Sequence, residues 1–81
     1  GYAALVAAEH HRRRGEFEPA RAAYDAGIAH YETNIKALPD GADLCQHFIA
    51  LALAGRARMA LEQGDLERAT NELLASFARR A

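Results

Sequence analysis

The sequence predicts an all-α domain of four helices, and three observations support this prediction. Alanine, leucine, arginine and glutamate dominate the composition, and β-branched residues are scarce, which favours helix over strand. Apolar residues recur at separations of three and four. Glycine and proline interrupt that periodicity at three places. Because the chain has 81 residues, 51% of them hydrophobic, we expect a single domain over residues 1–81, with helices at about 2–14, 18–37, 41–63 and 66–80.

The first two helices are separated by Gly15, which is suited to the left-handed conformation of a helix C-terminal cap. The second helix begins near Glu18 and Pro19, since proline is tolerated in the first turn and glutamate complements the helix dipole. It carries the clearest periodic signal of the chain, an apolar stripe expected to face the core: Ala20, Tyr24, Gly27, Ile28, Tyr31, Ile35 and Leu38.

The third helix follows a turn signal, Pro39-Asp40-Gly41, and we expect Asp40 or Asp43 to cap it. Gly55 lies within its apolar stripe, where it allows a neighbouring helix to approach closely. The expected face contains Leu44, Phe48, Leu51, Ala52, Gly55 and Met59, and Ile49, Leu53 and Ala60 widen it, so this helix should pack on two sides.

The last helix begins after Gly64, with Asp65 as its expected cap. Its apolar stripe is Leu66, Ala69, Leu73 and Phe77. The segment 64–69 aligns without a gap with 15–20: a glycine, an acidic residue, an aromatic or leucine, then an alanine five residues after the glycine. Small and large residues thus alternate in the same order in both halves of the chain.

This spacing resembles the second half of the tetratricopeptide repeat (TPR), a helical hairpin. The resemblance implies two TPR-like antiparallel hairpins that pack through Gly15, Phe17, Ala20, Tyr24, Gly27 and Ile28 in the first unit, and through Gly64, Leu66, Ala69, Leu73 and Phe77 in the second. The two glycines stand 49 residues apart, whereas the family's repeat is about 34 residues long. We therefore expect lengthened middle helices, and a four-helix bundle unrelated to the repeat is the alternative.

The resemblance implies a protein–protein interaction or scaffold module that receives a protein or peptide partner on a concave face. The family's groove positions correspond here to Tyr2, Leu5, Glu9, Arg12, Arg13, Leu51, Ala54, Arg58, Leu61 and Glu62. Leu5, Glu9 and Gly55 replace the lysine and asparagine residues with which chaperone-binding members hold a carboxylate, so that activity is not supported. Arg12, Arg13 and Arg58 can meet an acidic segment, although an ordinary charged helix surface is an equal alternative.

Self-association is a second expectation. Leu66, Leu73, Leu74 and Phe77 give the last helix a broad apolar face instead of the polar outer face of a terminal cap. The chain should therefore form a homodimer, or else pack against neighbouring repeats of a longer array.

Histidine and cysteine side chains are the candidates for a different class of function. His10 and His11 are adjacent and diverge by about 100° on a helix, and Cys45 and His47 lie on nearly opposite faces. A four-helix bundle that binds a metal or small ligand through His10, His11, His30, His47 and Cys45 is the alternative function. No phosphate-binding loop or catalytic motif occurs in the sequence, so we expect no metal, no cofactor and no enzymatic activity.

Charge and hydropathy narrow the remaining classes. A net charge of −1 argues against nucleic-acid binding, and the longest apolar run, 48–54, is too short for a membrane span. The single cysteine fits a reducing compartment, and the sequence shows no signal peptide. The excess of arginine over lysine is typical of GC-rich bacteria. We expect a cytoplasmic bacterial protein, and a regulatory segment of a transcription or signalling protein is a further alternative.

Overall fold

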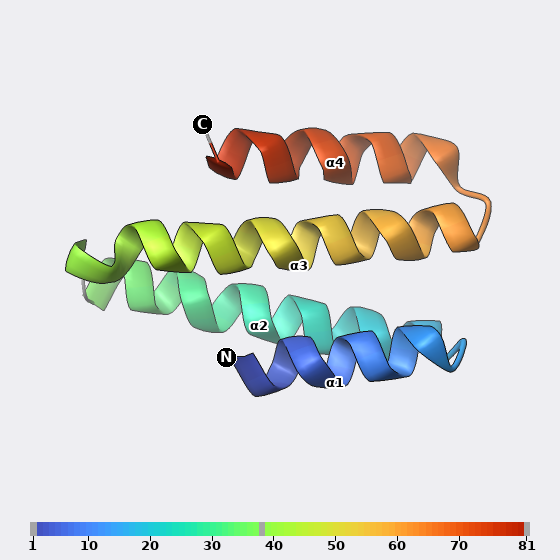
Figure 1. The fold of residues 1–81 in the computed structure, drawn as a ribbon, viewed down its shortest axis with the longest axis horizontal. Helices are drawn as coiled ribbons and strands as arrows, with labels where there is room; N and C mark the ends of the chain where they lie inside the picture. The colour runs from blue at the N-terminus through green and yellow to red at the C-terminus, as the bar shows by residue number, and fades with distance from the viewer. Residues whose placement is uncertain (1, 38, 81) are drawn as a thin grey trace.

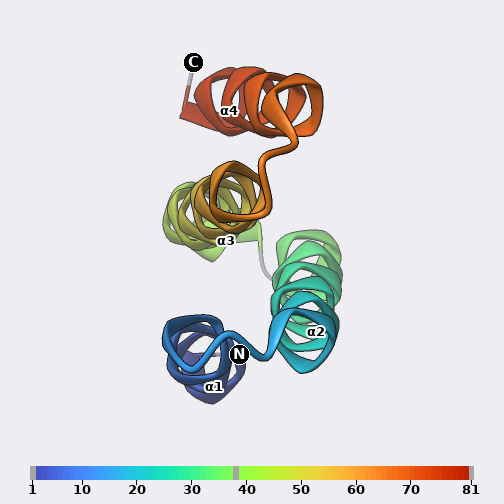
Figure 2. The same ribbon diagram turned by 90° about the vertical axis from the view of Figure 1, so that its right-hand side faces the viewer.

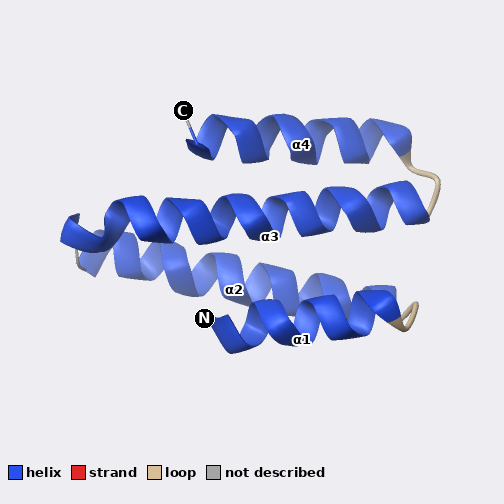
Figure 3. Ribbon diagram, in the orientation of Figure 1, coloured by secondary structure: helices blue, strands red, loops and turns tan. Residues whose placement is uncertain are grey.

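The computed structural model describes residues 2–37 and 39–80, and within them the chain is all-α. Four α-helices, α1 (Tyr2–Arg13), α2 (Phe17–Ala37), α3 (Ala42–Glu62) and α4 (Leu66–Arg80), follow one another along the chain (Figures 1 and 3). A short 3₁₀ helix, η1 (Pro39–Gly41), joins α2 to α3. The predicted fold class is confirmed, and each helix boundary lies within one residue of its expected place. Leu38 of the expected apolar stripe lies outside the described residues.

Successive helices are antiparallel and form an elongated assembly of 38 × 24 × 12 Å (Figure 1). Viewed along the helices, α1 and α3 lie on one side of the molecule and α2 on the other (Figure 2). Among the described helices, the backbone of α4 packs against α3, and Arg79 of α4 forms an ion pair of 2.6 Å with Glu32 of α2. The third helix therefore packs on two sides, as its wide apolar surface predicts.

The two turns within the hairpins have the same geometry. Gly15 and Gly64 adopt positive φ angles of 76° and 79°, which confirms both as left-handed caps. After α1, the amide of Glu16 donates to the His11 carbonyl at 2.9 Å, and the amide of Asp65 donates to the Ala60 carbonyl at the same distance after α3. Both ends are therefore Schellman motifs with the same hydrogen bonds.

The helix N-terminal caps agree with the sequence in one case and differ in another. Asp65 accepts a hydrogen bond from the amide of Arg68 at 3.0 Å through its side chain, so the expected cap of α4 is confirmed. The expected cap of α3 is wrong, because Gly41 occupies that position and no side chain caps the helix. The 3₁₀ turn through Asp40 runs directly into α3, so Asp40 stands one residue before the N-cap position and Asp43 lies within the first turn.

The core confirms most of the α2 stripe, in which Ala20, Tyr24, Gly27 and Tyr31 are buried. The expected apolar face of α3 needs correction at two large residues, because Leu44 and Leu51 are 61% and 41% exposed. The buried core cluster comprises Leu5, Ala8, Ala20, Tyr24, Tyr31, Ile49, Ala52, Leu53 and Met59, with Phe17 and Ile28 partly buried against it.

The interface of α3 with α4 is made by small residues. Ala69 and Ser76 of α4 are buried, and the Ser76 hydroxyl donates to the Ala50 carbonyl at 2.8 Å. Leu66 and Phe77 were expected to pack inside the second repeat, but they are 68% and 63% exposed, so this expectation is not met within the chain. The helix α4 lies at the edge of the described structure (Figure 2), where α3 buries Ala69 of the expected stripe but leaves Leu66 and Phe77 exposed.

Close contact between α2 and α3 depends on Gly55. A Cβ atom placed on Gly55 would lie 2.6 Å from the ring of Tyr24, far inside van der Waals contact. Tyr24 is only 1% exposed and its hydroxyl donates to Glu9 at 2.8 Å, so moving the ring would disturb both its packing and this hydrogen bond. The prediction that this glycine permits close approach is therefore confirmed.

We expect Gly55→Ala to destabilise the fold by about 1–3 kcal/mol, because the steric cost of displacing the buried ring exceeds the gain in helix propensity. Urea unfolding followed by circular dichroism measures this change. The matched control is Gly41→Ala, since a Cβ there meets nothing within 4 Å and the φ of Gly41 is −96°. Equal stability of the two variants would contradict the prediction.

Candidate functional site

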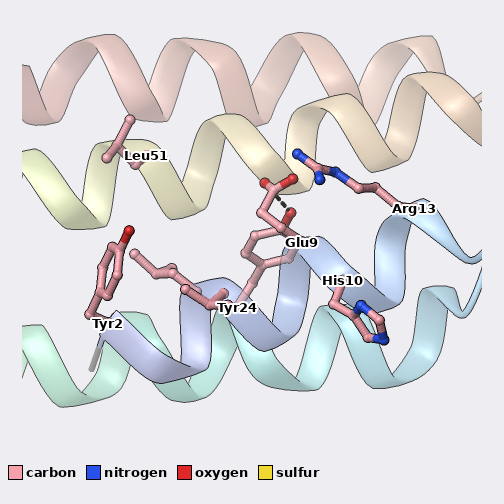
Figure 4. Close-up of a pocket in the computed structure, with 8 residues that line it drawn as sticks. Tyr2, Glu9, His10, Arg13, Tyr24 and Leu51 are labelled. Carbon is pink, nitrogen blue, oxygen red and sulfur yellow. Dashed lines mark hydrogen bonds between the residues drawn. The ribbon is translucent and has the colours of Figure 1, made fainter.

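A groove of about 500 Å³ lies between α1 and α3 and is the candidate functional site (Figure 4). Most of its lining comes from one face of α1, because residues separated by three or four positions project from the same side of a helix. Tyr24 of α2 and Leu51 of α3 complete it. The lining residues are Tyr2, Leu5, Val6, Glu9, His10, Arg13, Tyr24 and Leu51. A groove of this size with a mainly apolar lining and a few polar groups is typical of binding sites.

The groove is apolar at one end and charged at the other. Tyr2 and Leu51 mark the apolar end, while Glu9 and Arg13 lie toward the opposite end (Figure 4). Tyr2, with 66% of its surface exposed, and Val6, with 53% exposed, offer apolar surface to a ligand without being needed in the core. The groove can therefore distinguish the two ends of a ligand by polarity.

A hydrogen-bonded network beneath the groove fixes its charged end. The guanidinium of Arg12 donates to Glu9 Oε2 through Nη2 at 2.6 Å and through Nε at 3.2 Å. Its Nη1 donates to Glu62 Oε1 at 2.7 Å, and the Tyr24 hydroxyl donates to Glu9 Oε1 at 2.8 Å. Arg12 is only 8% exposed, and two partly exposed carboxylates, those of Glu9 and Glu62, neutralise its charge. These four side chains join α1, α2 and the last residue of α3.

Arg13 follows Glu9 by four residues on α1, a spacing that favours an ion pair, but Arg13 is not the partner of Glu9. Glu9 pairs with Arg12 three residues away, because both side chains project toward α2 and α3. Arg13 lies about 100° further around α1 and remains exposed at the rim of the groove.

The titration properties of the network match its hydrogen bonds. Burial alone would raise the pKa of Glu9, but hydrogen bonds from Arg12 and Tyr24 outweigh it and hold the pKa below its usual value of 4.5. Burial, and then the hydrogen bond to Glu9, raises the pKa of the Tyr24 phenol to about 12. Glu9 is therefore an ionised acceptor at neutral pH, and Tyr24 is a protonated donor.

The structure brings together part of the predicted concave face. Tyr2, Leu5, Glu9, Arg13 and Leu51 line the groove. The other members do not: Arg12 is buried and binds the exposed Glu62, and Ala54, Arg58 and Leu61 lie along α3 outside the groove lining.

Three lining residues were missed in the sequence. Val6 and His10 follow Tyr2 at steps of four, and this period could have identified them. No pattern in the sequence indicated that Tyr24 lines the groove, because this side chain reaches the groove from the neighbouring helix α2.

The histidines and the cysteine are spread over three helices, although the ring centroids of the neighbours His10 and His11 on α1 lie 6.0 Å apart. His11 Nδ1 is 2.8 Å from Glu16 Oε1, so this pair closes the turn between α1 and α2. His30 and His47 are exposed on α2 and α3, and Cys45 is half-buried beside the core. In the part of the chain that the structure describes, no group of three or more His, Cys, Asp and Glu side chains is arranged to hold a metal ion.

Comparison of the chain with protein-family models, with curated proteins and with solved structures found no match. Among the described helices, none has the length and apolar character required to cross a membrane.

We expect Arg12→Ala to destabilise the fold by about 1–3 kcal/mol, since Glu9 and Glu62 would lose their common donor. Arg13→Ala is the matched control, because Arg13 is adjacent, exposed and forms no ion pair among the described residues. Its effect should stay within about 0.5 kcal/mol. Thermal and urea unfolding of both variants measure the difference, and comparable losses would contradict the network.

The network should also give the stability a specific pH dependence. The pKa of Glu9 is lowered in the folded state, so its ionised form stabilises the fold above about pH 4.5. This contribution is lost as the pH falls through the lowered folded-state value. We therefore expect wild type to be more stable than Glu9→Gln at pH 7 and the gap to narrow below pH 4.5, as measured by urea unfolding at several pH values. A gap that is constant with pH would be inconsistent with an ionised Glu9.

Proposed function

We propose that this chain is a protein–protein interaction module of TPR-like helical hairpins, and that the groove between α1 and α3 receives a segment of a partner protein. The observation that carries the proposal is the polarity of the groove, apolar between Tyr2 and Leu51 and charged around Arg13. An extended or helical segment can lie along such a groove with an apolar anchor at one end.

The hairpin architecture supports the TPR-like part of the proposal. The two turns share one hydrogen-bonding pattern around Gly15 and Gly64. The first helices of the two hairpins, α1 and α3, lie on the same side of the molecule, where the resemblance expects a concave face (Figure 2). The exposed Leu66 and Phe77 mark where the second hairpin departs from the first.

Charge indicates the chemistry of the partner segment. Both oxygens of Glu9 already accept hydrogen bonds, one from Tyr24 and one from Arg12. Arg13 forms no ion pair within residues 2–37 and 39–80, so it is the cation available at that end of the groove. An acidic side chain placed a few residues from the apolar anchor would complement it.

We propose that the protein is a scaffold rather than an enzyme. The cytoplasmic location of the protein, its bacterial origin and its capacity to self-associate stay predictions from the sequence.

We expect selection of a phage-displayed random peptide library on the immobilised protein to enrich sequences that combine an aromatic or aliphatic residue with a nearby Asp or Glu. Val6→Asp should weaken binding of an enriched peptide at least about tenfold, or about 1.4 kcal/mol, because it places a charge in the apolar part of the groove. Val6 is exposed, so the variant should keep its helicity.

Leu44→Asp is the matched control, since Leu44 is similarly exposed but lies outside the groove. Arg13→Glu should weaken the acidic peptides selectively. If no peptide family is enriched, or if Val6→Asp binds as well as Leu44→Asp, the proposal for the groove is refuted.

A further inference from the structure

A second exposed apolar surface lies on α4, outside the groove. It consists of Leu66, Leu73, Leu74 and Phe77, which are 68%, 37%, 60% and 63% exposed, and of Leu61 at the end of α3, which is 50% exposed. We call these five residues the α4 face. None of them lines the groove.

The spacing of the α4 face is that of a helix-pairing seam. Residues 66, 70, 73 and 77 are separated by four, three and four positions, the spacing of the apolar positions in a coiled coil. Ala69 and Ser76, which bury against α3, lie roughly 80° around the helix from this seam. The seam therefore points to a second partner that α3 does not provide.

Polar groups do not interrupt the seam. Thr70 is its only polar member, and its hydroxyl already donates to the Leu66 carbonyl at 2.9 Å. The charged residues that α4 turns toward its neighbours are held on another side of the helix, where Glu72 binds Arg56 and Arg79 binds Glu32, each at 2.6 Å. The seam is thus free of charge and of unsatisfied polar groups, so covering it with apolar surface carries little desolvation cost.

The seam is complementary to itself in the antiparallel direction. A two-fold axis placed midway between residues 70 and 73 sets Leu66 opposite Phe77 of the other copy, and Thr70 opposite Leu73. A large residue then meets a smaller one at the two central positions, and the helix dipoles oppose each other. A parallel pair would instead place Phe77 against Phe77 and Thr70 against Thr70.

The area of the α4 face suits a dimer. Its exposed fractions together amount to nearly three fully exposed large side chains, or roughly 550 Å² at about 200 Å² each. A standard interface takes about 800 Å² from each partner, of which about 57% is apolar. The α4 face therefore supplies the apolar part of such an interface, and its polar surroundings can supply the rest.

We propose that a second copy of this chain covers the α4 face, with the two α4 helices antiparallel around a two-fold axis. The inference rests on the proposed function as an interaction module, and it assigns self-association to a surface separate from the partner groove. The five residues of the α4 face and the residues that line the α1–α3 groove do not overlap, so the two surfaces can be changed separately by mutation.

The test is the molar mass in solution, by sedimentation equilibrium from about 5 to 500 µM, a range that resolves micromolar dissociation constants. Wild type should approach twice its 8.8 kDa. The double variant Leu74→Glu, Phe77→Glu should weaken the dimer at least about 100-fold and keep its helicity, because both side chains are exposed. Leu44→Glu is the control for charge on an exposed leucine and should leave the dimer intact.

A monomeric wild type over this range, or a double variant that dimerises like wild type, would overturn the proposal. The peptide assay separates this failure from failure of the groove, since the double variant should still bind the enriched peptides and Val6→Asp should still dimerise.

A disulfide cross-linking test determines whether the two α4 helices are antiparallel. In a Cys45→Ser background, copies carrying Leu66→Cys and copies carrying Phe77→Cys should form a mixed disulfide when combined and oxidised, because the two positions face each other. A disulfide-linked dimer of Leu66→Cys copies alone would overturn the antiparallel arrangement.

Discussion

The fold depends on the ring of Tyr24, which fills the space left by the absent side chain at Gly55. This contact allows α2 to approach α3 closely, and it places the Tyr24 hydroxyl where it can donate to Glu9 of α1. Glu9 in turn accepts from Arg12, and Arg12 extends to Glu62 at the end of α3. One aromatic side chain thus connects three helices, first by packing and then by a chain of charge-assisted hydrogen bonds.

The same constraint explains why a groove exists between α1 and α3. Their backbones make little direct contact, so the position of α1 is set by α2 on one side and by the Arg12–Glu62 ion pair at one end. At the other end of α1, the ring of Tyr2 packs edge to face on Phe48 of α3, and Tyr2 and Val6 keep most of their surface exposed. Because Arg12 is neutralised within the network, Arg13 is left to define the charge at the rim.

Local features of this structure could be predicted from the sequence, and features that depend on a distant partner could not. The caps at Gly15, Gly64 and Asp65 follow from the conformations and hydrogen bonds of adjacent residues. The buried stripe through Tyr24 follows from the spacing of apolar residues by three and four positions along α2. Burial of Arg12 does not, because its second carboxylate is fifty residues away, and neither does the exposure of Phe77, because a helical period identifies an apolar face without saying what covers it.

The packing of α4 shows why that uncovered face matters. Ala69 and Ser76 bring α4 close to α3, but they bury little apolar area, so α4 gains less from the hydrophobic effect than the other helices do. Isolated helices of this length are marginal in water, and the ion pairs of Glu72 and Arg79 are partly exposed and contribute modestly. The large apolar residues of α4 lie instead on the neighbouring stripe, where an interface rather than the core would bury them. Association through this stripe would therefore add buried apolar area to a helix whose contact with α3 is made by small residues.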